Sequence, residues 1–561
     1  MAYTIGLDYG TNSVRCVVVN TKNGEETGTF VYPYSSGKDG IILDHLDTNL
    51  ARQNSADYIK GIETSVKNAI KAAKKNDKNF KPEKIIGIGV DTTGSTPIPV
   101  DKNGTPLCEL AKFRKNPNAM AWLWKDHTGY AEAAQITALA KKYKPEYLAK
   151  CGGIYSSEWF FSKILHCLNV DKKVFDAAYS WVECADYIPA VLTGDTKPEN
   201  IKRGRCPAGH KAMFNEDWGG LPAKSFLNKL NPKLGDLRDR LYKKTYTVDT
   251  AAGKLSKQWA KKLNLSENIP IAVGAFDAHL GAIGSSVKTG TLVKIIGTST
   301  CDVIVSPKKG KLADIPGVCG IVDGSVLPNF WGLEAGQSAV GDIFNWFVNY
   351  IQPGGKFEAS HEELTKKAAK LKPAQSGLLA LDWNNGNRTI LVDQRLTGLL
   401  IGQTLGTKPE EIYRALIEAT AFGALTIINR FEEYGVKIKE IMNCGGIAEK
   451  NPLLMQIYAD ITGREMKVSR SAQSCALGSA IAAAVAAGKK AGGYDNFASA
   501  QAAMCGVKKK TYKPNAKNQK IYAELYKLYK RLHDAFGVKD NKAALSDVMK
   551  KLLEIKEKVN K

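Results

Sequence analysis

A glycine-containing turn between two apolar, strand-forming runs occurs twice in this sequence, about half a chain apart. The first copy, at residues 5–19, reads IGLDYGTNSVRCVVV, and the second, at residues 292–305, reads LVKIIGTSTCDVIV. Each copy predicts a strand, a tight turn and a second antiparallel strand. Two such hairpins in two halves predict an internal duplication, with a ligand held between the copies.

The chemistry of the first turn favours an anion such as phosphate. Gly10 lets backbone N–H groups approach the anion closely, while Thr11, Asn12 and Ser13 add hydroxyl and amide donors. Asp8 lies just upstream and would repel phosphate unless a metal ion lay between them. The turn therefore predicts phosphate plus Mg²⁺, and the alternative is an ordinary edge hairpin with a polar tip.

Length and composition indicate a large soluble protein. A chain of 561 residues is too long for one core, and we expect domains at 1–285 and 286–505 with a helical appendage at 506–561. We find no apolar run of transmembrane length and no signal region at the N-terminus, so we expect a cytoplasmic protein without a membrane partner. Eleven cysteines without a Cys-x-x-Cys pair indicate reduced, mostly buried thiols.

The net charge of +23 does not by itself indicate nucleic-acid binding. The lysines lie on apparent helix surfaces and in the tail, without interleaved stacking aromatics, which favours a solvated surface and no nucleic-acid partner. The tail carries an amphipathic pattern at Ile521, Leu525, Leu528, Leu532 and Phe536, which predicts a brace. An oligomer contact there, and hence a homodimer, stays open.

Several polar residues follow predicted strands, where open α/β sheets form ligand pockets. The strand at 84–91 runs into Asp91-Thr92-Thr93-Gly94-Ser95, and the strand at 271–276 ends at Asp277, next to a helix start. A carboxylate in this position either accepts a proton from a substrate hydroxyl or caps the helix. Lys211, in a loop rich in glycine and proline, is either a solvated amine or a donor to substrate oxygens.

Two further segments have features of a binding site. Trp122 and Trp124 are mixed with hydrogen-bonding residues, which suits either a sugar or a structural aromatic cluster. A strand at about 440–444 runs into Gly445-Gly446, where missing side chains let an adenosine ring or a phosphate lie against the backbone.

Taken together, these motifs resemble a known family. The runs GLDYGTNSVR, GAFDAH, GTS and CGGIAEKNP, spread over roughly residues 3–500, are similar to the FGGY carbohydrate kinases. The runs GVDTTGSTP, LWKDHT, AGHKAM, WGLEAGQSA and DWNNGNR resemble the branch of that family that phosphorylates ribulose. Two positions depart from the family signatures, since His166 stands where a tryptophan is expected after Lys163, and Gln403 where an aliphatic residue is expected.

The resemblance implies an α/β fold with two ribonuclease-H-like domains of the actin, hexokinase and Hsp70 type, an ATP cleft between them, and C-terminal helices. It implies ATP- and Mg²⁺-dependent phosphorylation of the 5-hydroxyl of a ketopentose, L-ribulose foremost, in arabinose catabolism. Alternatives are a kinase for another ketose or polyol, such as D-ribulose, xylulose or ribitol, or an actin-like ATPase switch.

The resemblance also assigns roles to residues of this sequence. Asp277 is implied as the general base, and Gly94, Ser95, Lys211 and Glu334 are implied to line the sugar pocket beside it. Asp8 would face the metal ion. The residues implied to surround the nucleotide are Gly10, Thr11, Asn12, Arg15, Gly297, Thr298, Ser299, Gly341, Asn345, Gly445, Gly446 and Asn451.

Overall fold

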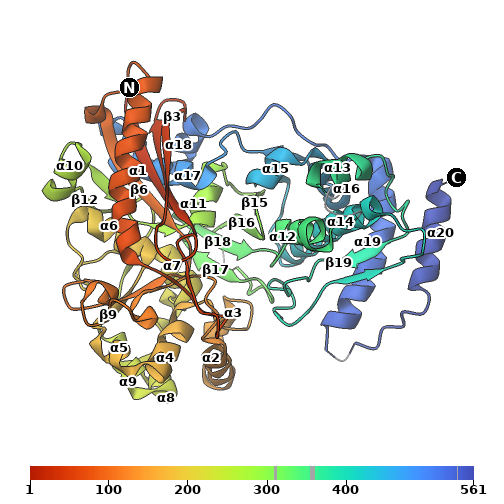
Figure 1. Ribbon diagram of the computed structural model, residues 1–561, viewed down its shortest axis with the longest axis horizontal. Coiled ribbons are helices and arrows are strands. Elements are labelled where there is room, and N and C mark those ends of the chain that lie inside the picture. Colours follow the sequence, from red (N-terminus) through yellow and green to blue (C-terminus); the bar gives the residue numbers. More distant parts are fainter. Residues whose placement is uncertain (309–311, 354–359, 540, 561) are drawn as a thin grey trace.

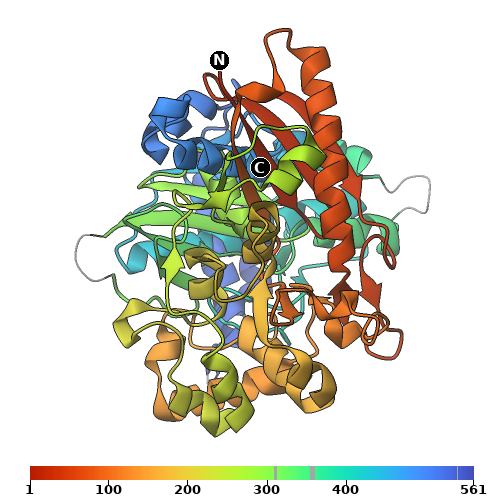
Figure 2. The ribbon, with the colours of Figure 1, turned by 90° about the vertical axis from the view of Figure 1, so that its left-hand side faces the viewer.

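The computed structural model describes residues 1–308, 312–353, 360–539 and 541–560, and they form two halves that each contain a mixed sheet (Figure 1). The first sheet has the order β12-β13-β6-β1-β2-β3, with β14 also paired to β6, and the second has the order β17-β18-β16-β15-β21-β22. Figure 2 views the molecule from the side of the first half. The predicted α/β architecture with two related sheets is confirmed.

Both predicted hairpins are present, each at the centre of its sheet. In the first sheet, β1 (Tyr3–Tyr9) pairs antiparallel with β2 (Ser13–Asn20) and parallel with β6 (Ile85–Thr92). In the second, β15 (Thr291–Ile296) pairs antiparallel with β16 (Thr300–Pro307) and parallel with β21 (Glu440–Cys444). The same pairing pattern in both sheets supports the predicted duplication.

The remaining strands extend these two sheets at their edges. In the first half these are β3 (Glu26–Pro33), β12 (Ala251–Lys254), β13 (Pro270–Ala272) and β14 (Ala275–Phe276). In the second half they are β17 (Gly320–Asp323), β18 (Phe330–Ala335) and β22 (Met466–Val468). Helix α1 (Ser55–Asn76), predicted at 55–75, covers β2 and β3 with its apolar face.

Two helices meet where the halves join. Helix α11 (Asp277–Gly284) of the first half also contacts β15 and β16 of the second sheet. Helix α17 (Ser474–Ala487) of the second half packs on β1, β6 and β13 of the first sheet and crosses α11. The small side chains of this alanine-rich helix let it lie across the other half.

Glycines allow this crossing because they remove the Cβ atoms that would hold the backbones apart. A Cβ at Gly478 of α17 would lie 1.8 Å from the carbonyl oxygen of Leu280, and one at Gly284 would lie 2.1 Å from that of Ser474. Glycines in the first sheet do the same, since a Cβ at Gly6 would lie 1.8 Å from the carbonyl oxygen of Ala476. Backbone therefore contacts backbone at this junction.

The C-terminal helices pack on the second half (Figure 1). Helix α19 (Ala516–Gly537) contacts α16 (Pro452–Thr462) and β19 (Leu379–Leu381), and α20 (Val548–Asn560) follows it. Leu525, Leu528 and Leu532 are buried as predicted, whereas Phe536 is 55% exposed.

The structure describes all eleven cysteines, and each is free. Within the described ranges, no helix combines the length and apolar character needed to span a bilayer.

We predict that Gly478→Ala lowers the free energy of unfolding by about 2 kcal/mol, because its Cβ would force α11 and α17 apart. Urea unfolding measures this change. Gly406→Ala is the matched control, since a Cβ there comes no closer than 3.9 Å to a neighbouring atom. Equal stability of the two variants would contradict the close crossing.

Candidate active site

A cavity of about 230 Å³ lies where the two hairpin turns meet. Thr11 reaches it from the first turn, and Gly297, Thr298 and Ser299 reach it from the second. The other predicted site residues that line it are Gly94, Lys211, Asp277 and Glu334. The structure thus brings together residues that are separated by more than three hundred positions in the sequence.

Asp277 is the first residue of α11 and directly follows strand β14. Its Oδ1 accepts a hydrogen bond of 2.6 Å from the backbone N–H of Ala278. The carboxyl group therefore contacts the start of its own helix and also faces the cavity. Burial, reinforced by the nearby charge of Asp8, raises the pKa of Asp277 to about 7. A carboxylate with this pKa suits general base chemistry near neutral pH.

Asp8 and Asp91 lie side by side on the parallel strands β1 and β6. Arg15, opposite Asp8 on β2, places Nη1 3.5 Å from its Oδ2. Burial raises the pKa of both carboxyls, and for Asp91 the charge of Asp8 adds to the effect. Asp91 Oδ2 accepts a hydrogen bond of 2.5 Å from Ser479 Oγ, whereas its buried Oδ1 has no partner among the described residues. Two adjacent carboxylates with a free oxygen fit a hard cation such as Mg²⁺.

Lys211 and Glu334 form a buried ion pair at the cavity wall. Lys211 ends helix α7 (Arg205–Lys211), Glu334 lies in β18, and Nζ is 3.3 Å from each carboxylate oxygen. Although burial opposes ionisation, Lys211 holds the pKa of Glu334 well below its usual range, with help from His210 and His279. Lys211 is only 6% exposed, so the alternative of a solvated amine is wrong.

Two histidines support this ion pair. His210 Nδ1 lies 3.5 Å and His279 Nε2 3.8 Å from Glu334 Oε2, and the two Nε2 atoms are 3.0 Å apart. Burial lowers the pKa of both imidazoles, to about 4 for His279. These three side chains are close enough to share a metal ion. However, Lys211 already neutralises Glu334, so we interpret the group as a neutral hydrogen-bonded support.

The two predicted tryptophans have different surroundings. Trp124 lines the cavity and donates from Nε1 to Thr11 Oγ1 at 3.0 Å, which connects the aromatic segment to the first turn. Trp122 is fully buried, with the guanidinium carbon of Arg52 3.4 Å from its ring centre. Trp122 therefore belongs to the structural cluster, and only Trp124 is in a position to meet a ligand.

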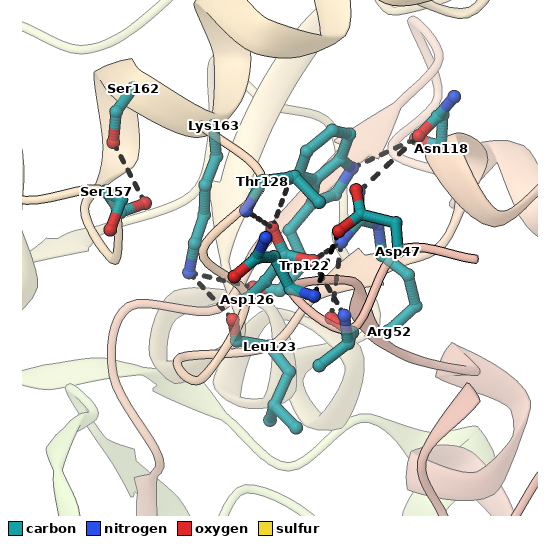
Figure 3. Close-up of polar contacts among 12 residues, drawn as sticks. Asp47, Arg52, Asn118, Trp122, Leu123, Asp126, Thr128, Ser157, Ser162 and Lys163 are labelled. Atoms are coloured by element: carbon teal, nitrogen blue, oxygen red, sulfur yellow. Dashed lines mark hydrogen bonds and ion pairs between the residues drawn. The ribbon is translucent and has the colours of Figure 1, made fainter. Parts of the chain in front are cut away.

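A buried lysine ties the cavity wall together (Figure 3). Lys163 Nζ donates to the backbone oxygens of Ser95 at 2.7 Å, Leu123 at 2.8 Å and Trp122 at 3.3 Å. These three acceptors flank Gly94 and Trp124, which both line the cavity. Lys163 thus holds two separate segments of the pocket in place without reaching the ligand space.

Several predicted residues lie near the cavity without lining it. Ser95 is fully buried and its hydroxyl donates to Glu183, and substrate binding by Ser95 stays a prediction. Asn12 is exposed and donates to the Asp39 carbonyl at 2.7 Å. Asn451 caps α16, where its Oδ1 accepts from Leu454 N–H at 3.0 Å. Gly10, at the end of β1, closes the first turn with a hydrogen bond of 2.9 Å to the Ser13 carbonyl.

The predicted glycines of the second half gather around its turn. A Cβ at Gly341 would lie 2.5 Å from the Gly297 carbonyl oxygen, and one at Gly445 would lie 2.3 Å from that of Ile296. Gly446 begins the short helix α15 (Gly446–Lys450), next to Gly445. Asn345 is exposed on α12 (Gly341–Trp346) and accepts a hydrogen bond from Asn349.

Sequence reasoning assigned no role in the site to Asp91, His279 or Arg388. Asp91 lies beside Asp8, because the two residues pair in the register of β1 and β6. His279 lines the cavity and appeared in the sequence only within the GAFDAH run that carries the family resemblance. Arg388 lines the cavity from a segment that was noted only for its family resemblance.

Comparisons with known proteins agree with this geometry. Family models described as the N-terminal and C-terminal domains of the FGGY family of carbohydrate kinases match residues 3–284 and 292–487. The chain belongs to the FGGY family of carbohydrate kinases. ATP is accordingly a substrate, and the alternative of an actin-like ATPase switch is set aside.

Relatives of high similarity span nearly the whole chain. A ribulokinase of Vibrio parahaemolyticus is 42% identical, over 94% of this chain and 95% of the relative. A ribulokinase of Halalkalibacterium halodurans is 41% identical, over 99% of this chain and 97% of the relative.

Solved structures of sugar kinases share the fold. A gluconate kinase from Lactobacillus acidophilus has a TM-score of 0.77 at 18% identity, and a Plasmodium falciparum glycerol kinase with ADP has a TM-score of 0.76 at 16% identity. Each alignment covers 96% of this chain and 99% of the other. At this identity the likeness concerns the fold alone.

We predict that Asp277→Asn stabilises the protein at pH 7.5 and has little effect at pH 4. The raised pKa means that the folded state keeps the proton between about pH 4 and pH 7 while the unfolded state loses it. The wild type therefore loses stability as the pH rises through this window, and the amide variant does not. We expect a gain of about 1 to 3 kcal/mol at pH 7.5.

Urea unfolding at the two pH values measures this gain. The exposed Asp342→Asn on α12 is the control. A pH-independent difference between Asp277→Asn and wild type would show that the Asp277 carboxyl titrates alike in the folded and unfolded states.

Proposed function

We propose that this protein transfers the γ-phosphoryl group of ATP to the 5-hydroxyl of L-ribulose and releases ADP and L-ribulose 5-phosphate. The observation that carries the proposal is the single cavity that contains Asp277, the Lys211–Glu334 pair and both hairpin turns. The ribulokinases at 41–42% identity over 94% or more of the chain support the choice of sugar.

The reaction follows from the groups around the cavity. The 5-hydroxyl oxygen attacks the γ-phosphorus, the bond from this phosphorus to the β–γ bridging oxygen breaks, and ADP leaves with the bond's electron pair. Asp277 takes the proton of the hydroxyl through Oδ2, because its Oδ1 accepts the hydrogen bond from the Ala278 N–H. The N–H and O–H donors of Thr11 and of residues 297–299 face the phosphates.

The Lys211–Glu334 pair suits sugar recognition. The ammonium group donates to a hydroxyl oxygen, and the ionised carboxylate accepts from a hydroxyl group. The pair can therefore bind sugar hydroxyls both as acceptors and as donors of hydrogen bonds. Because both groups are buried and mutually neutralised, the sugar meets them in a fixed geometry. This orients the 5-hydroxyl toward Asp277.

Mg²⁺ fits the carboxylates of Asp8 and Asp91. The unpartnered Asp91 oxygen offers a ligand atom, and the adjacent negative charges attract a dication. When bound, such an ion neutralises charge on the phosphate oxygens. The chain itself supplies the two carboxylates in register on adjacent strands and Arg15 next to them.

We further propose the division into units 1–285, 286–505 and 506–561, and a cytoplasmic enzyme that acts on free sugar without a nucleic-acid partner. The family matches at 3–284 and 292–487 support the first boundary. Helix α17 then belongs to the second unit by sequence and contacts the first. A homodimer stays a prediction.

We predict that L-ribulose gives the highest kcat/KM in a coupled ADP-release assay against D-ribulose, xylulose, ribitol and glycerol. The reason is that contacts between the pocket and every carbon of the sugar contribute to transition-state binding. Shorter or differently configured sugars lose part of these contacts. A higher kcat/KM for another ketose or polyol would replace L-ribulose by that substrate.

We predict that Asp277→Asn lowers kcat about a hundredfold or more and leaves ATP binding within about threefold, because the amide cannot accept the hydroxyl proton. Calorimetric titration with ATP and the ADP-release assay measure the two quantities. The wild-type kcat should also fall below about pH 7, as the Asp277 carboxylate becomes protonated. Near-normal turnover of the variant would remove Asp277 as the base.

A further inference from the structure

We propose that Arg388 is a specificity-determining residue that binds the oxygens at the carbon-1 end of the sugar, remote from Asp277. The inference rests on the proposed function and adds to it the residue that recognises the far end of the substrate. It arises from the position of one guanidinium group between two cavities.

Arg388 lies at the junction of the cavity described above with a second cavity of about 580 Å³. Lys211 and Glu334 line both cavities as well, whereas Asp277 and the two turns line only the smaller one. A ketose whose 5-hydroxyl meets Asp277 therefore passes the Lys211–Glu334 pair and points its other end toward Arg388.

Arg388 is half-buried, and its guanidinium group lacks the carboxylate partner that the buried Arg52, Arg203 and Arg414 have. Nη2 donates to the Thr300 carbonyl oxygen at 2.7 Å, but the buried Nε has no hydrogen-bond partner within the described part of the chain. Nor does Arg388 form an ion pair with any described carboxylate. By contrast, Arg414 pairs with Glu418 at 2.8 Å, and Arg52 pairs with Asp126.

An unpaired buried donor costs free energy unless a ligand completes its hydrogen bonds. The acceptors that a ketopentose brings to this place are the hydroxyl oxygen of carbon 1 and the carbonyl oxygen of carbon 2. A planar guanidinium can donate to two neighbouring oxygens at once, which suits this pair.

Arg388 lines the cavity of the two turns and also reaches the larger cavity, which none of the turn residues lines. Glu158 and Cys319 line the larger cavity together with Arg388, and neither lines the cavity that holds Asp277. Against the effect of burial, the neighbouring Cys319 and Cys301, together with Glu334 and Glu158, raise the pKa of Arg388.

Gly336 creates the space that the guanidinium occupies. A Cβ at position 336 would lie 2.3 Å from Arg388 Nη2 and 2.1 Å from the Thr300 carbonyl oxygen. The neighbouring Thr389 fixes the segment, since its Oγ1 accepts from Gly336 N–H at 2.9 Å. The backbone thus sets the position of the guanidinium before any ligand arrives.

The test compares Arg388→Gln with Arg395→Gln, a matched control from the same segment whose side chain also borders the larger cavity but is 94% exposed. For Arg388→Gln we expect a fall of about fiftyfold or more in kcat/KM for L-ribulose, mainly through KM, and ATP KM within threefold. Glycerol lacks the neighbouring hydroxyl and carbonyl oxygens of carbons 1 and 2 of the ketose, so its kcat/KM should stay within threefold. Arg395→Gln should stay within twofold of wild type in all assays.

Binding without turnover provides a second measurement. Titration of L-ribulose in the absence of ATP, followed by the fluorescence of Trp124 and Trp159 at the two cavities, should show a Kd raised at least tenfold in Arg388→Gln. Gly336→Ala, which displaces the guanidinium, should raise Kd in the same direction. Urea midpoints identify variants that lose stability.

The outcomes separate the two proposals. Unchanged L-ribulose binding in Arg388→Gln, or an equal loss with glycerol and L-ribulose, overturns the assignment of Arg388 to the far end of the sugar. Failure of the wild type to phosphorylate L-ribulose instead overturns the proposed substrate, and the same comparison is then made with the ketose that it does phosphorylate.

Discussion

The crossing of α11 and α17 is the contact on which the active site depends. Because Gly284 and Gly478 let backbone touch backbone, one helix of each half lies against the other half. The same crossing places Asp277, at the start of α11, between the two hairpin turns. A side chain at the crossing would separate the halves and move Asp277, the proposed general base, away from the two hairpin turns.

Charge is the second organising constraint. Asp8, Asp91, Asp277 and Glu334 gather around one site, while Lys211 neutralises only Glu334. Burial, together with repulsion from Asp8 and Glu334, raises the pKa of Asp277 to about 7. The same excess of negative charge favours a bound dication. The base and the proposed metal site are thus two consequences of one arrangement.

The reliable predictions were those that local sequence decides. A glycine turn between β-branched runs has few other solutions, so both hairpins were predicted correctly. The strand predicted at 271–276 is present as two short strands, β13 and β14, which both pair with β6. Polar side chains were harder to predict. Ser95 and Asn451 have hydrogen-bonding groups that suit a ligand, yet Ser95 bonds Glu183 and Asn451 caps a helix. Such competition between partners depends on neighbours that are distant in sequence.

By itself, the sequence determined the two hairpins and the family resemblance, because turn residues and motif spacing are local properties of the chain. The tertiary structure alone decided that α17 crosses to the other half, that Trp122 is buried while Trp124 faces the cavity, and that Arg388 has no carboxylate partner among the described residues. These outcomes depend on which surfaces meet when the halves pack, and no local pattern records that choice.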